Sequence, residues 1–270
     1  MIVITLTKNS SKTIQTTIKS LENQTLKDIF WLILDEKSKD DTLNLIKHSK
    51  VKHEIIKISS NGLFAAYNKA IKILKKKKIN DIIFFLHSDD LIYDKYKLQN
   101  IKTIFIKKKI SALIGNIVYF RNNHNKYFRY WKSDYLEKQI KIGRDLYKFE
   151  KFSNKDFIFG WSFPHTSFFF HSRILKYIPK YDENFKTSSD YGWAIEILLQ
   201  NKFDVYFYDN FLVKMKSGGT STKISNLFKQ VVTDYKIIKK LFYKTFKDIF
   251  FCIIVLFSKK FRKLKQFLVY

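Results

Sequence analysis

Glycine, proline and cysteine are scarce in this chain. Its 270 residues include only 7 Gly, 2 Pro and 1 Cys. The single cysteine, Cys252, excludes an internal disulfide framework and fits a reducing compartment. The chain has no glycine-rich phosphate loop of the GxxxxGK or GxGxxG type, so a phosphorylated ligand would have to be held by other groups.

Acidic residues are outnumbered two to one. The chain has 24 Asp and Glu against 51 Lys and Arg, a net charge of +27. This charge suits nucleic acid, anionic lipid or a phosphorylated substrate. The abundance of Lys, Ile, Asn, Phe and Tyr is also typical of an AT-rich coding sequence. We therefore interpret local clusters of charge, and not the total, as functional.

Long apolar runs and a secretory leader are also missing from the pattern. The apolar segment 248–257 has about ten residues, whereas a bilayer-spanning helix needs about 20. The first residues, MIVITLTKNS, have no basic region before their apolar run, so we expect no signal peptide and a cytoplasmic protein. A hydrophobic content of 46% is enough for a large core and excludes a disordered chain.

Strand and helix patterns alternate in the first 90 residues. Apolar, β-branched runs predict strands at 2–6, 29–34, 54–58 and 82–86. Apolar residues at helical spacing predict a helix after each of the first three strands. Such alternation is typical of a parallel α/β sheet with helices on its faces, and its ligands bind beyond the carboxyl ends of the strands.

The second half of the sequence is less regular. Residues 121–160 show no clear pattern, and the last 47 residues change in character. The pattern predicts helices at 94–109 and 188–200, strands at 112–120, 166–170 and 203–209, and a loop at 216–222. We predict one domain over 1–223 and a basic, aromatic-rich helical tail over 224–270. The tail either packs on the core or lies on a membrane surface, with Phe250, Phe251, Ile254 and Phe257 toward lipid.

Carboxylates stand where predicted strands end. Asp35 follows 29–34, and Asp89 and Asp90 follow 82–86. The adjacent pair could face water, cap the next helix or hold a divalent cation. Its place at the ligand-binding edge of the sheet favours a cation such as Mn²⁺ or Mg²⁺, which would bridge the protein to a diphosphate. Asp190, at the start of a later helix, suits a helix cap or a functional group.

Five ordered blocks resemble the family 2 glycosyltransferases, which have the GT-A fold. The resemblance covers residues 1 to about 223 and is strongest for glycosyltransferases of bacterial surface-polysaccharide synthesis. The blocks are IVITLTKNS, LILDEKSKDDT, GLFAAYNKAI, LHSDD and the segment from FPHTSFFF to YDENFKTSSDYGWAIEI. The loop SGGTSTK resembles the Gly-Gly-x-Ser loop that often follows them in this family.

The resemblance implies a mixed, mainly parallel Rossmann-like sheet and an inverting, metal-dependent transfer of sugar. Asp190 would be the general base, and Asp89 and Asp90 would bind the metal. Nucleotide-sugar contacts would come from Thr7, Asn9, Asp35, Asn68, Asp89 and His165. The donor would be a nucleoside-diphosphate sugar, with UDP favoured, and the acceptor a hydroxyl of a glycan or lipid-linked acceptor. The enzyme would then work at the inner face of the cytoplasmic membrane, on an anionic surface, and could be a homo-oligomer.

Two other classes stay open on the residues alone. A nucleic-acid-binding protein would explain the charge, but no DNA- or RNA-binding motif is present, so we expect no nucleic-acid partner. A metal-dependent nucleotidyltransferase would also use paired aspartates, but its glycine-rich loop is missing from TLTKNSSKT. The histidines at 48, 53, 87, 124 and 171 show no spacing of metal ligands.

Overall fold

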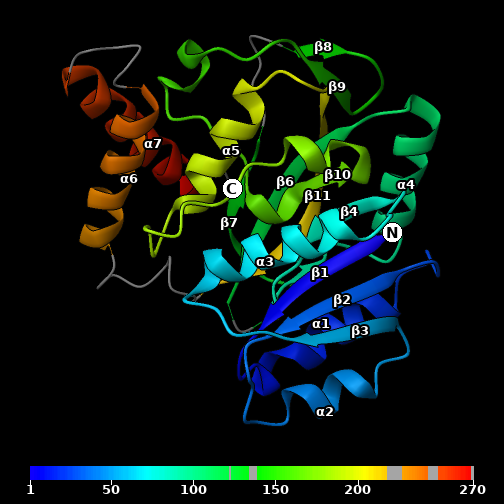
Figure 1. Ribbon diagram of the computed structural model, residues 1–270. Helices are drawn as coiled ribbons and strands as arrows, with labels where there is room; N and C mark the ends of the chain where they lie inside the picture. The colour runs from blue at the N-terminus through cyan, green and yellow to red at the C-terminus, as the bar shows by residue number, and fades with distance from the viewer. Residues whose placement is uncertain (122, 134–138, 218–226, 243–248, 269–270) are drawn as a thin grey trace.

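The structure is a computed structural model that describes residues 1–121, 123–133, 139–217, 227–242 and 249–268 (Figure 1). Its centre is one mixed sheet with the strand order β3-β2-β1-β4-β10-β6-β11-β9-β8, in which β5 pairs with β11 and β7 with β6. The strands are β1 (Ile2–Thr7), β2 (Phe30–Asp35), β3 (Lys52–Lys57), β4 (Ile82–Phe85), β5 (Leu91–Ile92), β6 (Ala112–Phe120), β7 (Tyr127–Trp131), β8 (Gln139–Lys141), β9 (Leu146–Phe149), β10 (Phe168–His171) and β11 (Val205–Lys216).

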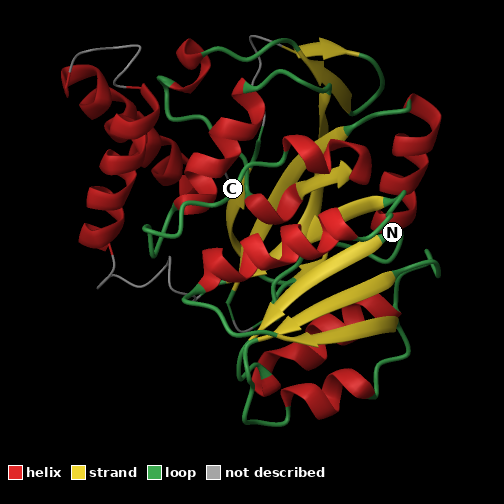
Figure 2. Ribbon diagram, viewed as in Figure 1, coloured by secondary structure: helices red, strands yellow, loops and turns green. Residues whose placement is uncertain are grey.

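Helices cover both faces of this sheet (Figure 2). They are α1 (Ser11–Glu22), α2 (Thr42–Lys47), α3 (Leu63–Lys76), α4 (Lys97–Lys108), α5 (Ser189–Leu199), α6 (Leu227–Phe242) and α7 (Ile249–Leu268). Successive strand residues point to opposite faces, so Ile4 and Leu32 belong to one apolar cluster and Val3 and Ile33 to the other. The predicted mixed sheet with flanking helices is confirmed.

Strands β1 to β4 pair in parallel, as the alternating sequence pattern predicts, in the order β3-β2-β1-β4. Their carboxyl ends therefore meet at one edge, and the polar residues that follow β1, β2 and β4 lie there. The next strand in the sheet, β10, is antiparallel to both β4 and β6. This insertion separates β4 from β6 and makes the sheet mixed.

Several predicted boundaries differ from the structure. The third strand is Lys52–Lys57 and not 54–58, and the strand predicted at 203–209 runs from Val205 to Lys216. Residues 121–160, which showed no pattern, contain β7, β8 and β9. Most of the predicted loop at 216–222 lies outside the described residues.

The C-terminal helices pack on the same core as the sheet. Ile237, Ile238 and Phe242 of α6 and Cys252 and Val255 of α7 are buried in the cluster that contains α3 and α5. Figure 1 shows α6 and α7 beside α5. The expectation that tail residues complete the core is therefore met for this face of the two helices.

The opposite face of α7 is exposed. It carries an apolar stripe at helical spacing, made of Phe250, Ile253, Phe257, Phe261 and Leu264. Of the four residues that we predicted to face lipid, two are exposed members of this stripe. The other two, Phe251 and Ile254, are only partly exposed, so the prediction was wrong about which residues form the outer face. No described helix is long and apolar enough to cross a membrane.

Candidate active site

Asp35 is completely buried at the carboxyl end of β2. The hydroxyl of Thr7, opposite it on β1, donates to Asp35 Oδ1 at 3.0 Å. The backbone N–H of Ser38 donates to Asp35 Oδ2 at 2.9 Å, and the Ser38 hydroxyl donates to Oδ1. Asp35 thereby fixes the turn after β2 and lies beside Thr7, another of the predicted nucleotide contacts.

Asn9 joins the turn after β1 to the turn after β2. Its backbone is in the left-handed region at φ 50°, which Asn tolerates better than most residues. Its side-chain oxygen accepts the N–H of Lys39 at 2.8 Å, and its own N–H donates to the Ser38 hydroxyl at 2.9 Å. These contacts hold the two loops together at the edge where a nucleotide is expected.

Asp40 has a structural role at the starts of two helices. One carboxylate oxygen accepts the N–H of Ser11 at 3.0 Å, and the other accepts the N–H of Thr42 at 3.1 Å. Hydrogen bonds from Thr42 and Ser11 hold the pKa of Asp40 well below its ordinary value. Asp40 therefore fixes the starts of α1 and α2.

An acidic cluster follows β4. Ligand-type atoms of His87, Asp89 and Asp90 all lie within 4.8 Å of one another. Asp90 is fully buried, and its Oδ1 accepts the backbone N–H of Lys216 at 3.0 Å. Its Oδ2 is buried 3.0 Å from His87 Nδ1, in a contact that lacks hydrogen-bond geometry.

The charge balance of this cluster fits a divalent cation. Burial, and then the neighbouring charge of Asp90, raise the pKa of Asp89, because two close carboxylates resist ionising together. Two carboxylate oxygens and an imidazole nitrogen are a donor set that Mn²⁺ or Mg²⁺ can use. A bound cation would remove the repulsion and use the buried Asp90 oxygen.

His87 corrects the sequence analysis, which found no ligand spacing around it. It is three residues from Asp90, and its Nε2 lies 2.9 Å from the hydroxyl of Tyr67 on α3. Burial alone would lower the pKa of His87, but Asp90, and then Asp89 and Asp190, outweigh it and raise the pKa to about 8. The HxDD spacing was visible in the sequence, whereas the contact with Tyr67 was not.

Asp190 lies in the first turn of α5, two residues after the N-cap residue Ser188. Burial raises the pKa of Asp190, while Lys259 of α7 acts against it. Burial and the charges of Asp190, Asp90 and Asp89 together raise the pKa of Tyr67. The charges of Asp89, Asp90 and Asp190 therefore all act on the same buried tyrosine.

His165 and Asn68 have mainly internal partners. The imidazole of His165 is buried, stacks on Phe85 with ring centroids 4.9 Å apart, and contacts the Tyr181 hydroxyl through Nε2. Burial lowers the pKa of His165 to about 3, so it is neutral at pH 7. The amide of Asn68 exchanges two hydrogen bonds with the backbone of Tyr181, at 2.8 and 2.9 Å, and donates to Glu183 at 2.7 Å.

Asn68 anchors the segment that leads into α5, and His165 packs beside Tyr67 with centroids 4.9 Å apart. Their direct contact with a sugar nucleotide stays a prediction.

Comparisons with known proteins identify the class to which this architecture belongs. The model of glycosyl transferase family 2 matches residues 2–173, which is more than half of the chain. The chain belongs to this family. That membership decides between the glycosyltransferase and the two other classes that the residues alone left open.

Particular relatives agree with this assignment. The chain is 27% identical to an uncharacterized glycosyltransferase of Methanocaldococcus jannaschii over 244 residues, 88% of this chain and 77% of the relative. The crystal structure of S. aureus TarS 1–349 with UDP-GlcNAc superposes with a TM-score of 0.64 at 18% identity, covering 88% of this chain and 64% of the other. The chain covers only 38% of a longer TarS chain.

A mannosyltransferase from Pyrobaculum calidifontis, in complex with GDP-Man and Mn²⁺, superposes with a TM-score of 0.58 at 12% identity. That alignment covers 97% of this chain and 73% of the mannosyltransferase. At these low sequence identities, the structural similarity establishes that this chain has the GT-A fold.

Proposed function

We propose that this protein is an inverting, metal-dependent glycosyltransferase. It would move a sugar from a nucleoside-diphosphate sugar, with UDP as the nucleotide, to a hydroxyl of a glycan or lipid-linked acceptor in surface-polysaccharide synthesis. The observation that carries the proposal is the His87–Asp89–Asp90 cluster at the ligand-binding edge of a family 2 fold, with the charge of Asp190 acting on the same Tyr67 that contacts His87.

The donor would lie across the loops after β1, β2 and β4. Thr7 and Asp35 form one hydrogen-bonded pair there, and Asn9 ties the first loop to the second. This arrangement supports a base- and ribose-binding role for Asp35, Thr7 and Asn9, with Asp89 nearer the ribose or diphosphate. The complexes of relatives with UDP-GlcNAc and GDP-Man make a sugar nucleotide the natural ligand class.

Asp89 and Asp90 would hold Mn²⁺ or Mg²⁺, with His87 as the third donor. When bound, the cation would stabilise the charge of the departing nucleoside diphosphate. The N–H of Lys216 fixes one oxygen of Asp90 and leaves the other directed at His87. Mn²⁺ in the structures of two relatives of the same fold supports this assignment.

Asp190 would act as general base. It would take the proton of the acceptor hydroxyl while that oxygen attacks the anomeric carbon and the bond from that carbon to the diphosphate breaks. A single in-line displacement of this kind inverts the anomeric centre. Burial raises the pKa of Asp190, which strengthens it as a base as long as it remains ionised.

The exposed stripe of α7 would rest on an anionic membrane, where a lipid-linked acceptor is available. Phe257 is 71% exposed and Phe250 65%. The α7 sequence has five basic and no acidic residues. Such a helix lies in the interface with its apolar side chains among the lipids. The working site would then be the inner face of the cytoplasmic membrane.

A binding experiment tests the central proposal. The probes are UDP, GDP and dTDP, each with and without Mn²⁺, measured by thermal shift and then by calorimetry. We expect one nucleotide, UDP, to bind only with the cation. Equal stabilisation by all three nucleotides in EDTA, or by an oligonucleotide alone, would contradict the proposal.

A further inference from the structure

The two C-terminal helices reach the helix that carries Asp190. A Cβ added to Gly160 would lie 2.2 Å from the backbone nitrogen of Lys259, so only glycine allows α7 to come this close to the sheet domain. A Cβ added to Gly192 would lie 3.1 Å from Ile237 Cγ2 of α6, which is closer than ordinary van der Waals contact. Helix α6 thus contacts α5 directly at Gly192, and α7 contacts the segment that contains Gly160.

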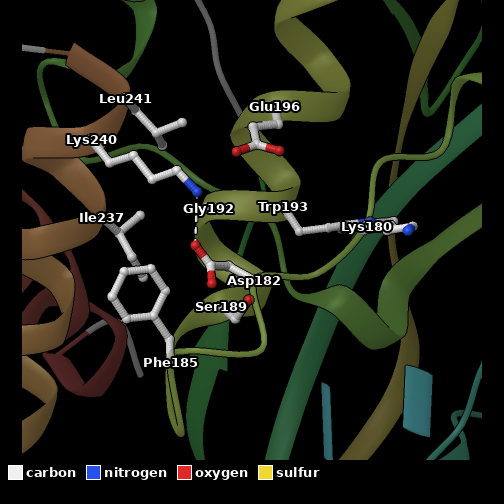
Figure 3. Close-up of a pocket in the computed structure, with 10 residues that line it drawn as sticks. All are labelled: Lys180, Asp182, Phe185, Ser189, Gly192, Trp193, Glu196, Ile237, Lys240 and Leu241. Atoms are coloured by element: carbon white, nitrogen blue, oxygen red, sulfur yellow. Dashed lines mark hydrogen bonds and ion pairs between the residues drawn. The ribbon is translucent and has the colours of Figure 1, made fainter. Parts of the chain in front are cut away.

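Figure 3 shows the α5–α6 side of this contact. Asp182, just before α5, pairs with Lys240 of α6 at 2.7 Å, and Ile237 of α6 lies next to Gly192 of α5. This contact holds α6 beside the N-terminal half of α5. It also fixes the position of α7, which packs on α6.

Lys259 is the residue that α7 directs toward the start of α5. Its Nζ lies 2.6 Å from Asp234 Oδ1 and 3.6 Å from the centroid of the Tyr191 ring. Tyr191 directly follows Asp190. The buried carboxylate of Asp234 also pairs with Lys260 through its other oxygen, at 2.5 Å. Of these two lysines, Lys259 is the one that lies over the Tyr191 ring.

The charges around Asp190 come from three elements. Lys259 on α7 and His87 after β4 favour its ionised form, and Asp234 on α6 opposes it. Burial first, and then the charge of Asp190 among others, raise the pKa values of Tyr67, Tyr119 and Tyr181, so these hydroxyls are neutral near pH 7. Lys259 is the strongest of the charges that lower the pKa of Asp190.

We propose that Lys259 is a positioning residue of the transfer reaction, which holds a positive charge beside the first turn of α5 so that Asp190 stays ionised and in place. The inference rests on the proposed role of Asp190 as the base. It makes α7 a part of the catalytic machinery: one face supplies a charge to the site, and the other face carries the exposed apolar stripe.

The test follows the titration of Asp190 itself. Full-length protein is labelled with ¹³C at the aspartate carboxyl carbons, and the spectrum of Asp190→Asn identifies the Asp190 signal. Lys259→Gln keeps a hydrogen-bond donor for Asp234 but removes the charge. We expect this change to raise the titration midpoint of Asp190 by about one pH unit, and Lys259→Arg to restore it.

Lys260→Gln is the matched control, because it removes a cation from the same Asp234 without removing the one over Tyr191. It should shift the midpoint by less than about half as much. If Lys259→Gln does not fold, the Asp190 titration is measured in Lys259→Met, which also lacks the charge. An unchanged midpoint without the Lys259 charge, or an equal shift in the control, would overturn the inference. Transfer by Asp190→Asn would instead refute the base assignment and leave this titration result standing.

Discussion

The hydroxyl of Tyr67 lies 2.9 Å from Nε2 of His87 and connects helix α3 to the acidic cluster after β4. Because the other ring nitrogen of His87 faces Asp90, the tyrosine sets the orientation of the imidazole toward the carboxylates. Partners of this kind, one step away from a metal, tune its affinity.

Replacing Tyr67 should therefore weaken metal binding without removing a ligand. We expect Tyr67→Phe to lower the Mn²⁺ affinity measured in the presence of UDP by about tenfold. Tyr181→Phe is the control, since its hydroxyl contacts His165 and not His87. Equal Mn²⁺ affinities in the two variants and the wild type would show that His87 is not part of the metal site.

Asp90→Asn should abolish turnover and cation-dependent nucleotide binding, because a neutral amide cannot balance the charge of the ion. Calorimetry with UDP and Mn²⁺ measures this loss. Asp94→Asn, which removes a carboxylate that pairs with Lys97, is the control. Full activity in EDTA would exclude a metal-dependent reaction.

Asp190→Asn should keep donor binding and lose transfer by at least about 10²-fold, because only the proton acceptor is removed. The rate of the wild type should fall on the acidic side with an inflection above 3.8, since burial raises the pKa of Asp190 and the base must be ionised. Transfer within about tenfold of wild type would reduce Asp190 to a residue of the helix start.

His165 should make stability depend on pH. The unfolded chain protonates this histidine near 6.5, whereas the buried ring does so only near 3. Stability is therefore complete above 6.5 and is lost as the pH falls toward 3, by about 1.4 kcal/mol per unit, or about 2 kcal/mol at pH 5.

Urea unfolding at pH 7.5 and pH 5 measures this effect, with His165→Phe as the variant. The difference between the two pH values should shrink by about 2 kcal/mol in His165→Phe. It should stay unchanged in His48→Gln, which alters an exposed histidine. The same pH dependence in His165→Phe as in wild type would show that the ring is not held neutral.

The stripe on α7 should bind anionic vesicles. Phe250→Ser combined with Phe257→Ser should lower co-sedimentation with vesicles of anionic lipid at low salt by about tenfold or more, since each change removes a large apolar side chain from the interface. Ile106→Ser, at an exposed position of α4, is the control. We choose substitutions because a truncation after residue 223 would remove α6 and α7, and both helices supply residues to the core. Wild-type protein that ignores the vesicles would contradict the membrane role.

The sequence alone predicted the alternating half of the fold and its acidic edge. Short β-branched runs and helical spacing depend on local chemistry, so β1, β2, β4, α1, α3 and α5 could be placed from residues 1–90 and 188–200. A polar residue after a buried strand marks the ligand edge of a parallel sheet, and Asp35, Asp89 and Asp90 lie there as predicted.

Tertiary structure decided the rest, because the contacts join residues far apart in the chain. Nothing local indicates that β10 lies antiparallel between β4 and β6, or that the N–H of Lys216 binds Asp90 across 126 positions. The C-terminal helices looked like an appendage because their lysines suggest a solvated surface. Only the fold buries Asp234 against Lys259 and brings that charge to Asp190, since a buried ion pair depends on packing that composition does not encode.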